Sequence, residues 1–536
     1  MTVDTSRTHT AADYDVIIAG GGLAGLTLAL QLQRDYPDLR TLVLERQQHP
    51  LPQAAHKVGE STVEIGAYYL AEIAGLREHL EEQHLRKFGL RFFFSHGASR
   101  IDQVAELGAT RQLATPSYQV DRGILENYMG QECQRRGIDF REGCMLRRCD
   151  LGENGDSHRV VWTHEGQSAQ ATTRWLVDAS GRRGLLKQQL GLARDNEHDA
   201  HAVWFRMDTR IKIDELCNDP AWRRQCTPPD RWLSTNHLTG PGYWVWLIPL
   251  ASGAHSIGIV ADSRMHALDD MRDFDLVMRW LQLNQPSLAA ALEPVREKLL
   301  DFRFLRNYSY SATQLFSADR WALTGEAGTF LDPFYSPGTD FIAIANTYIT
   351  ALIGRDRAGQ PLAPWARIYQ DLFFSFYEST LDLFKGQYPL FGNARVMTQK
   401  VTWDYAYYWA ILCPLVFQGR LTDIDLLGKM REEFRAATAL NQRMQRLLAD
   451  WHRSLGNAAS TAGPGLIDQI RLPWLVELNR QMGKRLDPTL LERQLHDNIR
   501  LLRSLAAAIS QHARVDAPHL EILETKEPDL PILDTE

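Results

Sequence analysis

Asp15-Val-Ile-Ile-Ala-Gly-Gly-Gly-Leu-Ala-Gly25 decides the fold of this chain. Its first five residues form a largely apolar run typical of a buried strand, and the next six have the pattern GxGxxG, with glycines at Gly20, Gly22 and Gly25. An apolar segment of helical length, residues 23–32, overlaps the end of this pattern and continues beyond it. Glycines at this spacing allow a tight turn and let backbone N–H groups approach a pyrophosphate at the helix N-terminus. The stretch therefore predicts a strand, a dinucleotide-binding turn and a helix.

A second apolar run, Thr41-Leu-Val-Leu44, completes a strand–helix–strand unit and ends at Glu45. Glu45 follows Gly25 by 20 residues, where an acidic side chain can accept hydrogen bonds from ribose hydroxyls. GxGxxG alone is a weak signal, but in this context it predicts a bound dinucleotide. The alternative is a glycine-rich turn that holds no ligand.

The composition is that of a globular protein, with 44% hydrophobic and 23% charged residues in 536. The net charge of −7 gives no overall attraction to nucleic acid or to anionic lipid. Six cysteines without a CxxC pair predict neither a disulfide framework nor a metal site. No secretory signal pattern and no apolar run of about 18 residues occurs, so we expect a soluble cytoplasmic protein.

Three further stretches resemble the FAD fold of the p-hydroxybenzoate hydroxylase class. They are Val177-Asp-Ala-Ser-Gly181, Leu323-Thr-Gly-Glu-Ala-Gly-Thr-Phe-Leu-Asp-Pro333 and Tyr118-Gln-Val-Asp-Arg122. Glu326 stands where that class usually has Asp beside the ribityl chain. No second GxGxxG occurs for NAD(P)H, so we expect reduced FAD to come from a separate flavin reductase. The cofactor-binding residues implied are Gly20, Gly22, Gly25, Glu45, Arg122, Asp178, Glu326 and Gly338.

The predicted fold class is α/β: a Rossmann-type FAD-binding domain, an inserted and mainly antiparallel β substrate subdomain, and an α-helical C-terminal lobe. Strand-like stretches alternate with loops between about 90 and 310, and segments of helical periodicity prevail after 342. Residues 455–466, rich in Gly, Pro, Ser and Thr, predict a loop between helices. The expected parts are a disordered N-terminus (1–13), the FAD-binding domain in three segments (14–90, 121–195 and 311–360), the substrate subdomain in two (91–120 and 196–310), the helical lobe (361–522) and a disordered tail (523–536).

Two motifs resemble signatures of the flavin-dependent halogenases: Lys57-Val-Gly-Glu-Ser61 resembles KxGES, and Trp244-Val-Trp-Leu-Ile-Pro249 matches WxWxIP. The resemblance implies an enzyme that uses reduced FAD, O2 and halide to make hypohalous acid, which halogenates a phenolic, pyrrolic or indolic substrate with the help of a lysine. A desolvated lysine suits this role, because it donates hydrogen bonds and can become nucleophilic. The motif match makes Lys57 the candidate catalytic residue; the alternative is a surface lysine that precedes a helix.

Trp244 and Trp246 alternate on one predicted strand, so both indoles should face the same side of the sheet. They could pack in the core, and by resemblance they could also form a wall between flavin and substrate. The aromatic segment Trp403–Cys413 likewise could line a substrate cavity or form helix–helix core.

Asp332-Pro-Phe-Tyr-Ser-Pro-Gly-Thr-Asp340 precedes a predicted helix whose N-terminal N–H groups are suited to a halide. By resemblance the halide would bind at Gly338 and Thr339. Pro337 has no N–H to offer one. Tyr335 aligns with a glutamate of the tryptophan halogenases, which favours a phenol- or pyrrole-type substrate over free tryptophan.

Three functions remain open from the sequence: a halogenase, an FAD-dependent aromatic monooxygenase that hydroxylates directly, and a flavin-binding protein without catalysis. Pro337 and Glu326 favour the monooxygenase; Lys57 and the tryptophan motif favour the halogenase. The expected partners are a transient flavin reductase and a small aromatic substrate, free or carrier-bound, with no nucleic acid or membrane.

Overall fold

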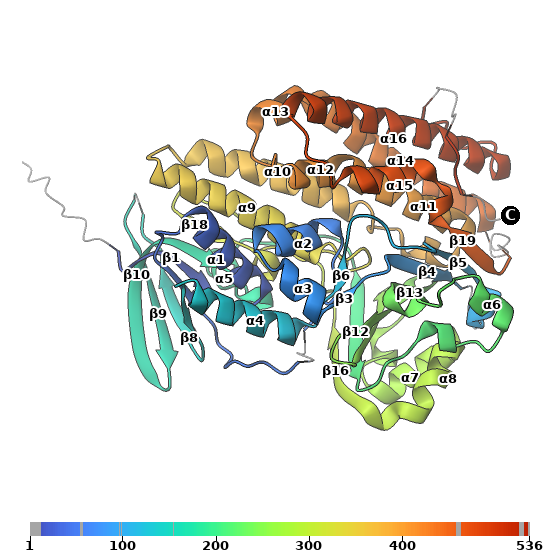
Figure 1. The fold of residues 1–536 in the computed structure, drawn as a ribbon, viewed down its shortest axis with the longest axis horizontal. Helices are drawn as coiled ribbons and strands as arrows, with labels where there is room; N and C mark the ends of the chain where they lie inside the picture. The colour runs from blue at the N-terminus through green and yellow to red at the C-terminus, as the bar shows by residue number, and fades with distance from the viewer. Residues whose placement is uncertain are drawn as a thin grey trace, which may run out of the picture.

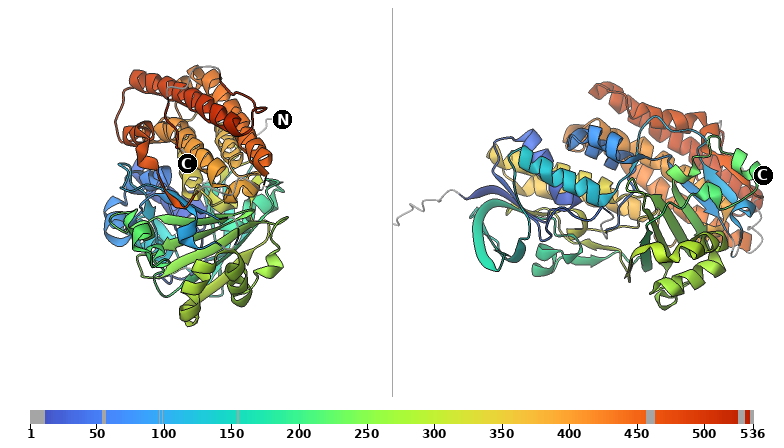
Figure 2. Two further views of the ribbon diagram at one scale, coloured as in Figure 1. Left: turned by 90° about the vertical axis from the view of Figure 1, so that its right-hand side faces the viewer. Right: turned by 60° about the horizontal axis from the view of Figure 1, so that its bottom comes forward.

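The computed structural model describes residues 12–533 except 54–56, 96, 98, 154, 457–462 and 525–529. It contains two large sheets and a helical lobe that lies along both of them (Figure 1). The left view of Figure 2 shows the helical lobe on one side of the molecule and the second sheet on the other.

The first sheet confirms the predicted dinucleotide-binding architecture. Its central strand β1 pairs in parallel with β2 and β10, and β10 also pairs in parallel with β18. An antiparallel extension, β10-β9-β8, completes it, so the sheet is mixed. Helices α1 (Leu23–Asp35) and α4 (Arg122–Arg135) pack together beside it. The strands are β1 (Tyr14–Ala19), β2 (Thr41–Leu44), β7 (Asp139–Arg141), β8 (Met145–Asp150), β9 (His158–His164), β10 (Gln167–Asp178) and β18 (Trp321–Leu323).

The second sheet has the order β16-β12-β15-β14-β13-β4-β5-β19. It is mainly antiparallel, as predicted, but β13 pairs with β4 and β5 pairs with β19 in parallel. Strand β19 comes from the helical lobe and begins inside the predicted 455–466 loop, a four-residue edge strand without the alternation that would reveal it. The strands are β4 (Leu90–Phe94), β5 (Ala105–Gly108), β12 (Ala200–Met207), β13 (Thr235–Gly240), β14 (Tyr243–Pro249), β15 (His255–Asp262), β16 (Leu299–Leu305) and β19 (Gly465–Asp468).

The helical lobe confirms the change of periodicity seen after residue 342. In its long amphipathic helix α14, Leu440, Met444, Leu447, Leu448 and Trp451 are buried at the spacing of one helix face. The predicted helix over 403–417 consists of the end of α11, a π-helical turn at 408–412 and α12. The helices are α9 (Gly338–Arg357), α10 (Ala363–Leu381), α11 (Ala394–Tyr407), α12 (Cys413–Phe417), α13 (Ile424–Lys429), α14 (Arg431–Leu455), α15 (Pro473–Gln481) and α16 (Pro488–Asp516).

Shorter elements connect these parts. Helices α7 and α8 cover the outer face of the second sheet and share a hydrophobic core with it. The helices are α2 (Glu64–Tyr68), α3 (Arg77–Gln83), α5 (Leu185–Gln189), α6 (Pro220–Arg224), α7 (Phe274–Asn284) and α8 (Pro286–Leu292), and the strands are β3 (Leu85–Arg86), β6 (Tyr118–Gln119), β11 (Ala193–Asp195) and β17 (Tyr310–Ala312).

One predicted terminus is wrong in part. Residues 530–533 pack on the helical lobe, where the carbonyl of Pro531 accepts a hydrogen bond of 2.9 Å from the Trp474 indole and Leu533 is buried. Apolar residues such as Leu533 hold residues 530–533 against the lobe, although the acidic, proline-containing composition of this terminus is typical of a disordered tail. Of the predicted N-terminal tail, residues 1–11 lie outside the described residues.

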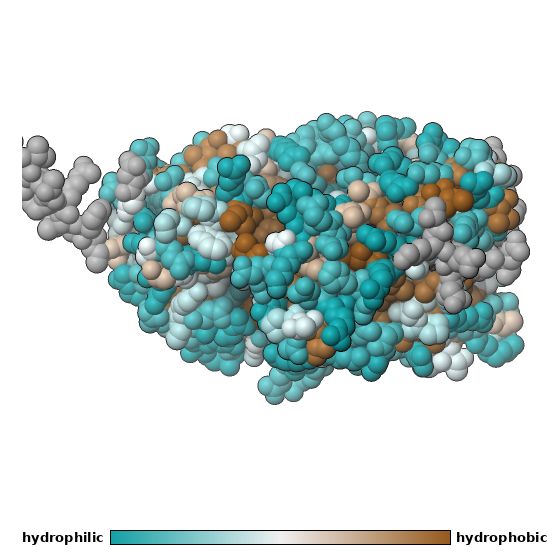
Figure 3. All heavy atoms as spheres, turned by 90° about the horizontal axis from the view of Figure 1, so that it is seen from above, coloured by the Kyte–Doolittle hydropathy of each residue, from teal (hydrophilic) through white to brown (hydrophobic). Residues whose placement is uncertain are grey.

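Seen from the side of the helical lobe, the surface is mainly hydrophilic with separate apolar patches (Figure 3). Within the described ranges, no helix combines the length and the hydrophobicity that crossing a bilayer requires.

Candidate functional site

The glycine turn between β1 and α1 is tight on its inner side and open on its outer side. Gly20 has φ +120°, and a Cβ there would lie 2.3 Å from the Ala179 carbonyl oxygen. A Cβ at Gly25 would lie 2.0 Å from the Gly20 carbonyl oxygen, whereas a Cβ at Gly22 would meet no atom within 4 Å. No side chain caps the N-terminus of α1. Free N–H groups beside open space match the needs of a pyrophosphate.

Glu45 stands at the end of β2, beside this turn. Its Oε2 accepts a hydrogen bond of 2.7 Å from the Gly21 N–H, and its Oε1 accepts one of 2.7 Å from the Gln47 N–H. These two bonds hold the carboxylate where a ribose would lie next to a pyrophosphate on α1.

A cavity lined by both tryptophans of β14, here called the tryptophan cavity, brings together half of the predicted site residues. Trp244 and Trp246 face the same side of β14, with ring centroids 5.7 Å apart. Their indole N–H groups donate to the Tyr388 hydroxyl (3.0 Å) and to the Ser256 hydroxyl (3.1 Å). The cavity is also lined by Leu23, Gly59, Glu60, Ser61, Arg122, Glu326, Gly338 and Thr339.

Arg122 and Lys57 lie together beside the tryptophan cavity. The Arg122 guanidinium donates to the Val58 carbonyl oxygen at 2.6 Å, and both cations pair with the buried carboxylate of Glu126. Burial acts to raise the pKa of Glu126, but the two cations outweigh it and lower this pKa. The Lys57 ammonium is thus engaged by Glu126, and in the described chain Lys57 lines neither the tryptophan cavity nor the substrate-sized cavity described below.

Asp178 does not face the tryptophan cavity. Its two carboxylate oxygens accept hydrogen bonds from the backbone N–H groups of Ser180 (2.9 Å) and Leu186 (2.7 Å). The side chain therefore fixes the turn that follows β10.

The N-terminus of α9 opens into the tryptophan cavity. Pro337 occupies its N-cap position, so the first N–H groups of this helix belong to Gly338 and Thr339. A Cβ on Gly338 would meet no atom within 4 Å. With the open turn at Gly22, this second open backbone stretch shows that the chain's residues fit an extended anionic dinucleotide such as FAD.

A buried network that the sequence did not reveal borders the same cavity. The Asp332 carboxylate accepts hydrogen bonds from the Tyr308 hydroxyl (2.7 Å) and the Tyr388 hydroxyl, and it pairs with His198 Nε2 at 2.7 Å. The Tyr388 hydroxyl in turn accepts the Trp244 indole N–H. The network fixes the orientation of the Trp244 indole.

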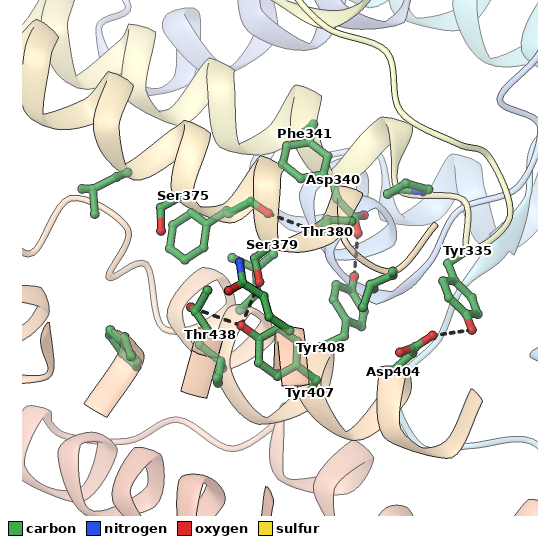
Figure 4. A pocket seen from close by; sticks show the side chains of 18 of the residues that line it. Tyr335, Asp340, Phe341, Ser375, Ser379, Thr380, Asp404, Tyr407, Tyr408 and Thr438 are labelled. Carbon is green, nitrogen blue, oxygen red and sulfur yellow. Dashed lines mark hydrogen bonds between the residues drawn. The ribbon is translucent and has the colours of Figure 1, made fainter. Parts of the chain in front are cut away.

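A second cavity, of about 580 Å³, lies between the start of α9 and the helices α10, α11 and α14. Tyr335, Tyr405, Tyr407 and Tyr408 line it, and we call it the tyrosine cavity (Figure 4). Its volume is within the range of small-molecule sites. Some members of the aromatic segment Trp403–Cys413 line this cavity, whereas others, such as Trp403, are fully buried between helices.

Two of the carboxylates that line the tyrosine cavity are occupied by donors of the protein. Asp404 accepts from the Tyr335 hydroxyl (2.7 Å), Lys400 (2.9 Å) and Gln445 (2.8 Å). Asp340 accepts from the Gly66 N–H (2.8 Å) and the Tyr408 hydroxyl (2.7 Å).

Lys87, which sequence reasoning missed, lines a small cavity of about 30 Å³ that shares Val63, Glu64, Leu90 and Tyr405 with the tyrosine cavity; like Lys57, it is not among the residues that line the two larger cavities. Its ammonium donates to the Ser61 hydroxyl (2.8 Å) and to the Thr62 carbonyl oxygen (2.9 Å). Ser61 lines the tryptophan cavity and contacts the Ser336 hydroxyl at 3.0 Å. Burial lowers the pKa of Lys87 to about 7, although Glu64 and Asp340 oppose this shift. Its sequence context, His84-Leu-Arg-Lys-Phe-Gly89, carries no pattern that would single out this lysine.

Known proteins share this architecture. Residues 13–236 match the family model described as "FAD binding domain". A flavin-dependent halogenase of Dictyostelium discoideum is 27% identical, covering 75% of this chain and 70% of that protein. A tetracycline 7-halogenase of Kitasatospora aureofaciens is 28% identical, and the match covers 63% of this chain and 62% of that protein. A 1H-pyrrole-2-carbonyl-[peptidyl-carrier protein] chlorinase of Pseudomonas fluorescens is 24% identical, and the match covers 83% of this chain and 97% of that protein.

Among solved structures, that of halogenase PltM in complex with phloroglucinol and FAD has a TM-score of 0.65 at 16% identity and covers 94% of this chain and 96% of that one. The fold and the glycine turn thus define an FAD-binding flavoprotein. Its relatives are flavin-dependent halogenases, as the two sequence motifs predicted.

Proposed function

We propose that this protein is a flavin-dependent halogenase that uses reduced FAD, O2 and a halide ion to halogenate an electron-rich aromatic substrate. When bound, reduced FAD would supply two of the four electrons that reduce O2, and the halide would supply the other two as it is oxidised to hypohalous acid. The cofactor would lie along Gly20, Gly22, Gly25, Glu45, Arg122 and Glu326 to reach Gly338, with Asp178 supporting the turn behind it. The halide would bind the N–H groups of Gly338 and Thr339.

The observation that carries this proposal is the set of contacts that Lys87 makes: its ammonium donates to Ser61, which lines the tryptophan cavity, and it lines a small cavity that shares Glu64 with the tyrosine cavity. Pro337 and Phe341 line both cavities, so an oxidant formed beside the tryptophans has only a short way to the tyrosine cavity. Lys87 contacts Ser61 of the tryptophan cavity and faces Glu64 of the tyrosine cavity. We therefore assign to Lys87 the role that the motif match suggested for Lys57. Its ammonium can donate a hydrogen bond to hypohalous acid, and its neutral form, accessible near pH 7, can carry the halogen.

Trp244 and Trp246 would form the wall that separates the aromatic substrate from the cofactor. Their indole N–H groups are fixed by Tyr388 and Ser256, so the wall cannot rotate away without losing hydrogen bonds. A substrate that cannot reach the cofactor is halogenated by the diffusing oxidant instead of being hydroxylated directly. Two relatives act, by name, on carrier-bound pyrroles, and we infer a small aromatic substrate here.

Because the sequence holds a single GxGxxG, we include a separate flavin reductase as transient partner. A mass-spectrometric product screen tests the function. The purified chain receives FAD, a flavin reductase, NADH, air and bromide, with phenols, pyrroles and indoles as substrates. A bromine isotope doublet in the product is the expected result. A gain of one oxygen that does not depend on halide would identify a monooxygenase instead, the function that Pro337 at the N-cap of α9 favours.

A further inference from the structure

Glu64 is the carboxylate that lines the tyrosine cavity at its lysine end. It is the first residue of α2, is 9% exposed, and lines both the tyrosine cavity and a small cavity of about 30 Å³ that contains Lys87. The two cavities share Val63, Glu64, Leu90 and Tyr405. Glu64 therefore faces the place where a substrate would meet the lysine.

Unlike the carboxylate oxygens of Asp340 and Asp404, those of Glu64 can still accept hydrogen bonds from a ligand. Within the described ranges, no donor makes a hydrogen bond of normal geometry to its carboxylate. The Trp409 indole N–H and the backbone N–H of Glu64 itself face the carboxylate and act to lower its pKa, but among the described residues neither reaches it with the geometry of a full hydrogen bond. A buried carboxylate in this state is costly unless a donor reaches it from the cavity. A ligand in the tyrosine cavity can supply the missing hydrogen-bond donor.

The charges around Glu64 favour a neutral donor. Burial raises the pKa of Glu64, and the facing Lys87 ammonium opposes that shift. The cavity walls beside it are apolar or aromatic: Val63, Leu90, Phe341 and Ile411. An aromatic ring that carries a hydroxyl group satisfies both features, because the ring packs on this wall while its O–H donates to the carboxylate.

Building on the proposed function, we propose that Glu64 binds a phenolic hydroxyl of the substrate and directs halogenation to the ring carbon next to that hydroxyl. The carbon–halogen bond forms as the oxygen–halogen bond of hypohalous acid breaks. The oxygen takes that electron pair, receives a proton from Lys87 and leaves as water. Glu64 takes the phenolic proton at the same time.

Loss of the ring proton to Lys87 and return of the other proton from Glu64 to the substrate oxygen then restore both groups. One ring C–H is exchanged for a C–halogen bond, and one hypohalous acid becomes one water. The step needs no oxidant beyond the hypohalous acid that the proposed function supplies.

The test uses 1-naphthol and 1-methoxynaphthalene, which differ in a single donated hydrogen bond. Wild type should bind the naphthol at least about tenfold more tightly than the ether, measured by calorimetry on the full chain. Glu64→Gln should reduce this preference to less than about threefold, because an amide is a weaker acceptor than a carboxylate. Glu78→Gln is the matched control: Glu78 is an exposed first-turn acid of α3, and its variant should keep the wild-type preference.

Turnover with bromide gives the second readout. Wild type should form mainly 2-bromo-1-naphthol, whereas Glu64→Gln should add the 4-bromo isomer in the proportion that free hypobromous acid gives. An unchanged binding preference in Glu64→Gln, at unchanged thermal stability, would overturn the hydroxyl site. An unchanged isomer ratio would overturn the directing role.

The binding readout needs no turnover. One outcome separates the two proposals: wild type binds the naphthol more tightly than the ether and Glu64→Gln loses this preference, while wild type forms no brominated product from any substrate. In that case the hydroxyl site stands and the proposed halogenase function fails.

Discussion

The ammonium nitrogen of Lys87 lies 2.8 Å from the hydroxyl oxygen of Ser61, the last residue of the motif that begins at Lys57. The motif thus contributes Val58, Gly59, Glu60 and Ser61, but not its lysine, to the lining of the tryptophan cavity. The Lys57 ammonium instead forms an ion pair with Glu126 on α4. A lysine 30 residues further along the chain, brought in by the segment between β3 and β4, occupies the position at which halogen transfer is proposed.

The glycine turn predicts a contrast between two alanine variants. Gly25→Ala should destabilise the fold by about 2 kcal/mol or more, because its methyl group meets the Gly20 carbonyl oxygen at 2.0 Å. Gly22→Ala has open space and should fold normally, yet bind FAD at least about tenfold more weakly, because the methyl group stands where the pyrophosphate approaches. Thermal unfolding and FAD fluorescence titration check the pair. Normal FAD affinity in Gly22→Ala would contradict the assigned cofactor position.

The network around Asp332 predicts a graded loss of stability. Asp332→Asn weakens three charge-assisted contacts and should cost on the order of 3 kcal/mol. Tyr388→Phe removes one donor from Asp332 and the acceptor of the Trp244 indole, and should cost about 1 kcal/mol. Urea unfolding followed by tryptophan fluorescence measures both. Equal losses would show that Asp332 is not the centre of the network.

Lys400 predicts the consequence of breaking a buried ion pair. Its ammonium is fully buried between Asp404 and Gln445, so Lys400→Met should cost about 3–5 kcal/mol by leaving Asp404 charged without its cation. Lys429→Met, on an exposed pair with Glu492, should change stability by less than about 1 kcal/mol. If both variants unfold at the same temperature, the buried pair contributes nothing.

The buried Asp340 carboxyl should make the folding stability depend on pH in one direction. Burial raises the pKa of Asp340 to about 8, well above the value of about 3.9 in an unfolded chain. The folded state therefore holds a proton that the unfolded state releases, so this group's contribution to stability is complete below about pH 4 and is lost as pH rises to about 8.

The Asp340→Asn variant lacks this titration. Between pH 5 and 8, the stability of wild type should fall relative to that of the variant by on the order of 1 kcal/mol per pH unit. Denaturant unfolding of both proteins at several pH values is the measurement. A constant difference between them would show that Asp340 is ionised throughout this range.

Local patterns predicted those parts of the site that depend on neighbouring residues in the chain. The glycine turn, Glu45 and the common side of Trp244 and Trp246 follow from spacing and strand alternation alone. Strand β19 was missed because an edge strand of four half-buried residues has no distinctive pattern. Lys87 was missed for a different reason: the role proposed for it depends on its burial against Ser61 and Thr62, which no local pattern shows.

The central claim is that this chain halogenates aromatic substrates through Lys87. The most direct test compares wild type, Lys87→Ala and Lys57→Ala in the bromide assay with a flavin reductase, NADH and a phenol, after equal folding of all three has been verified. We expect a brominated product from wild type, retention of bromination in Lys57→Ala, and a loss of about a thousandfold or more in Lys87→Ala while the protein still binds FAD. Full bromination by Lys87→Ala, or its loss in Lys57→Ala alone, would contradict the account.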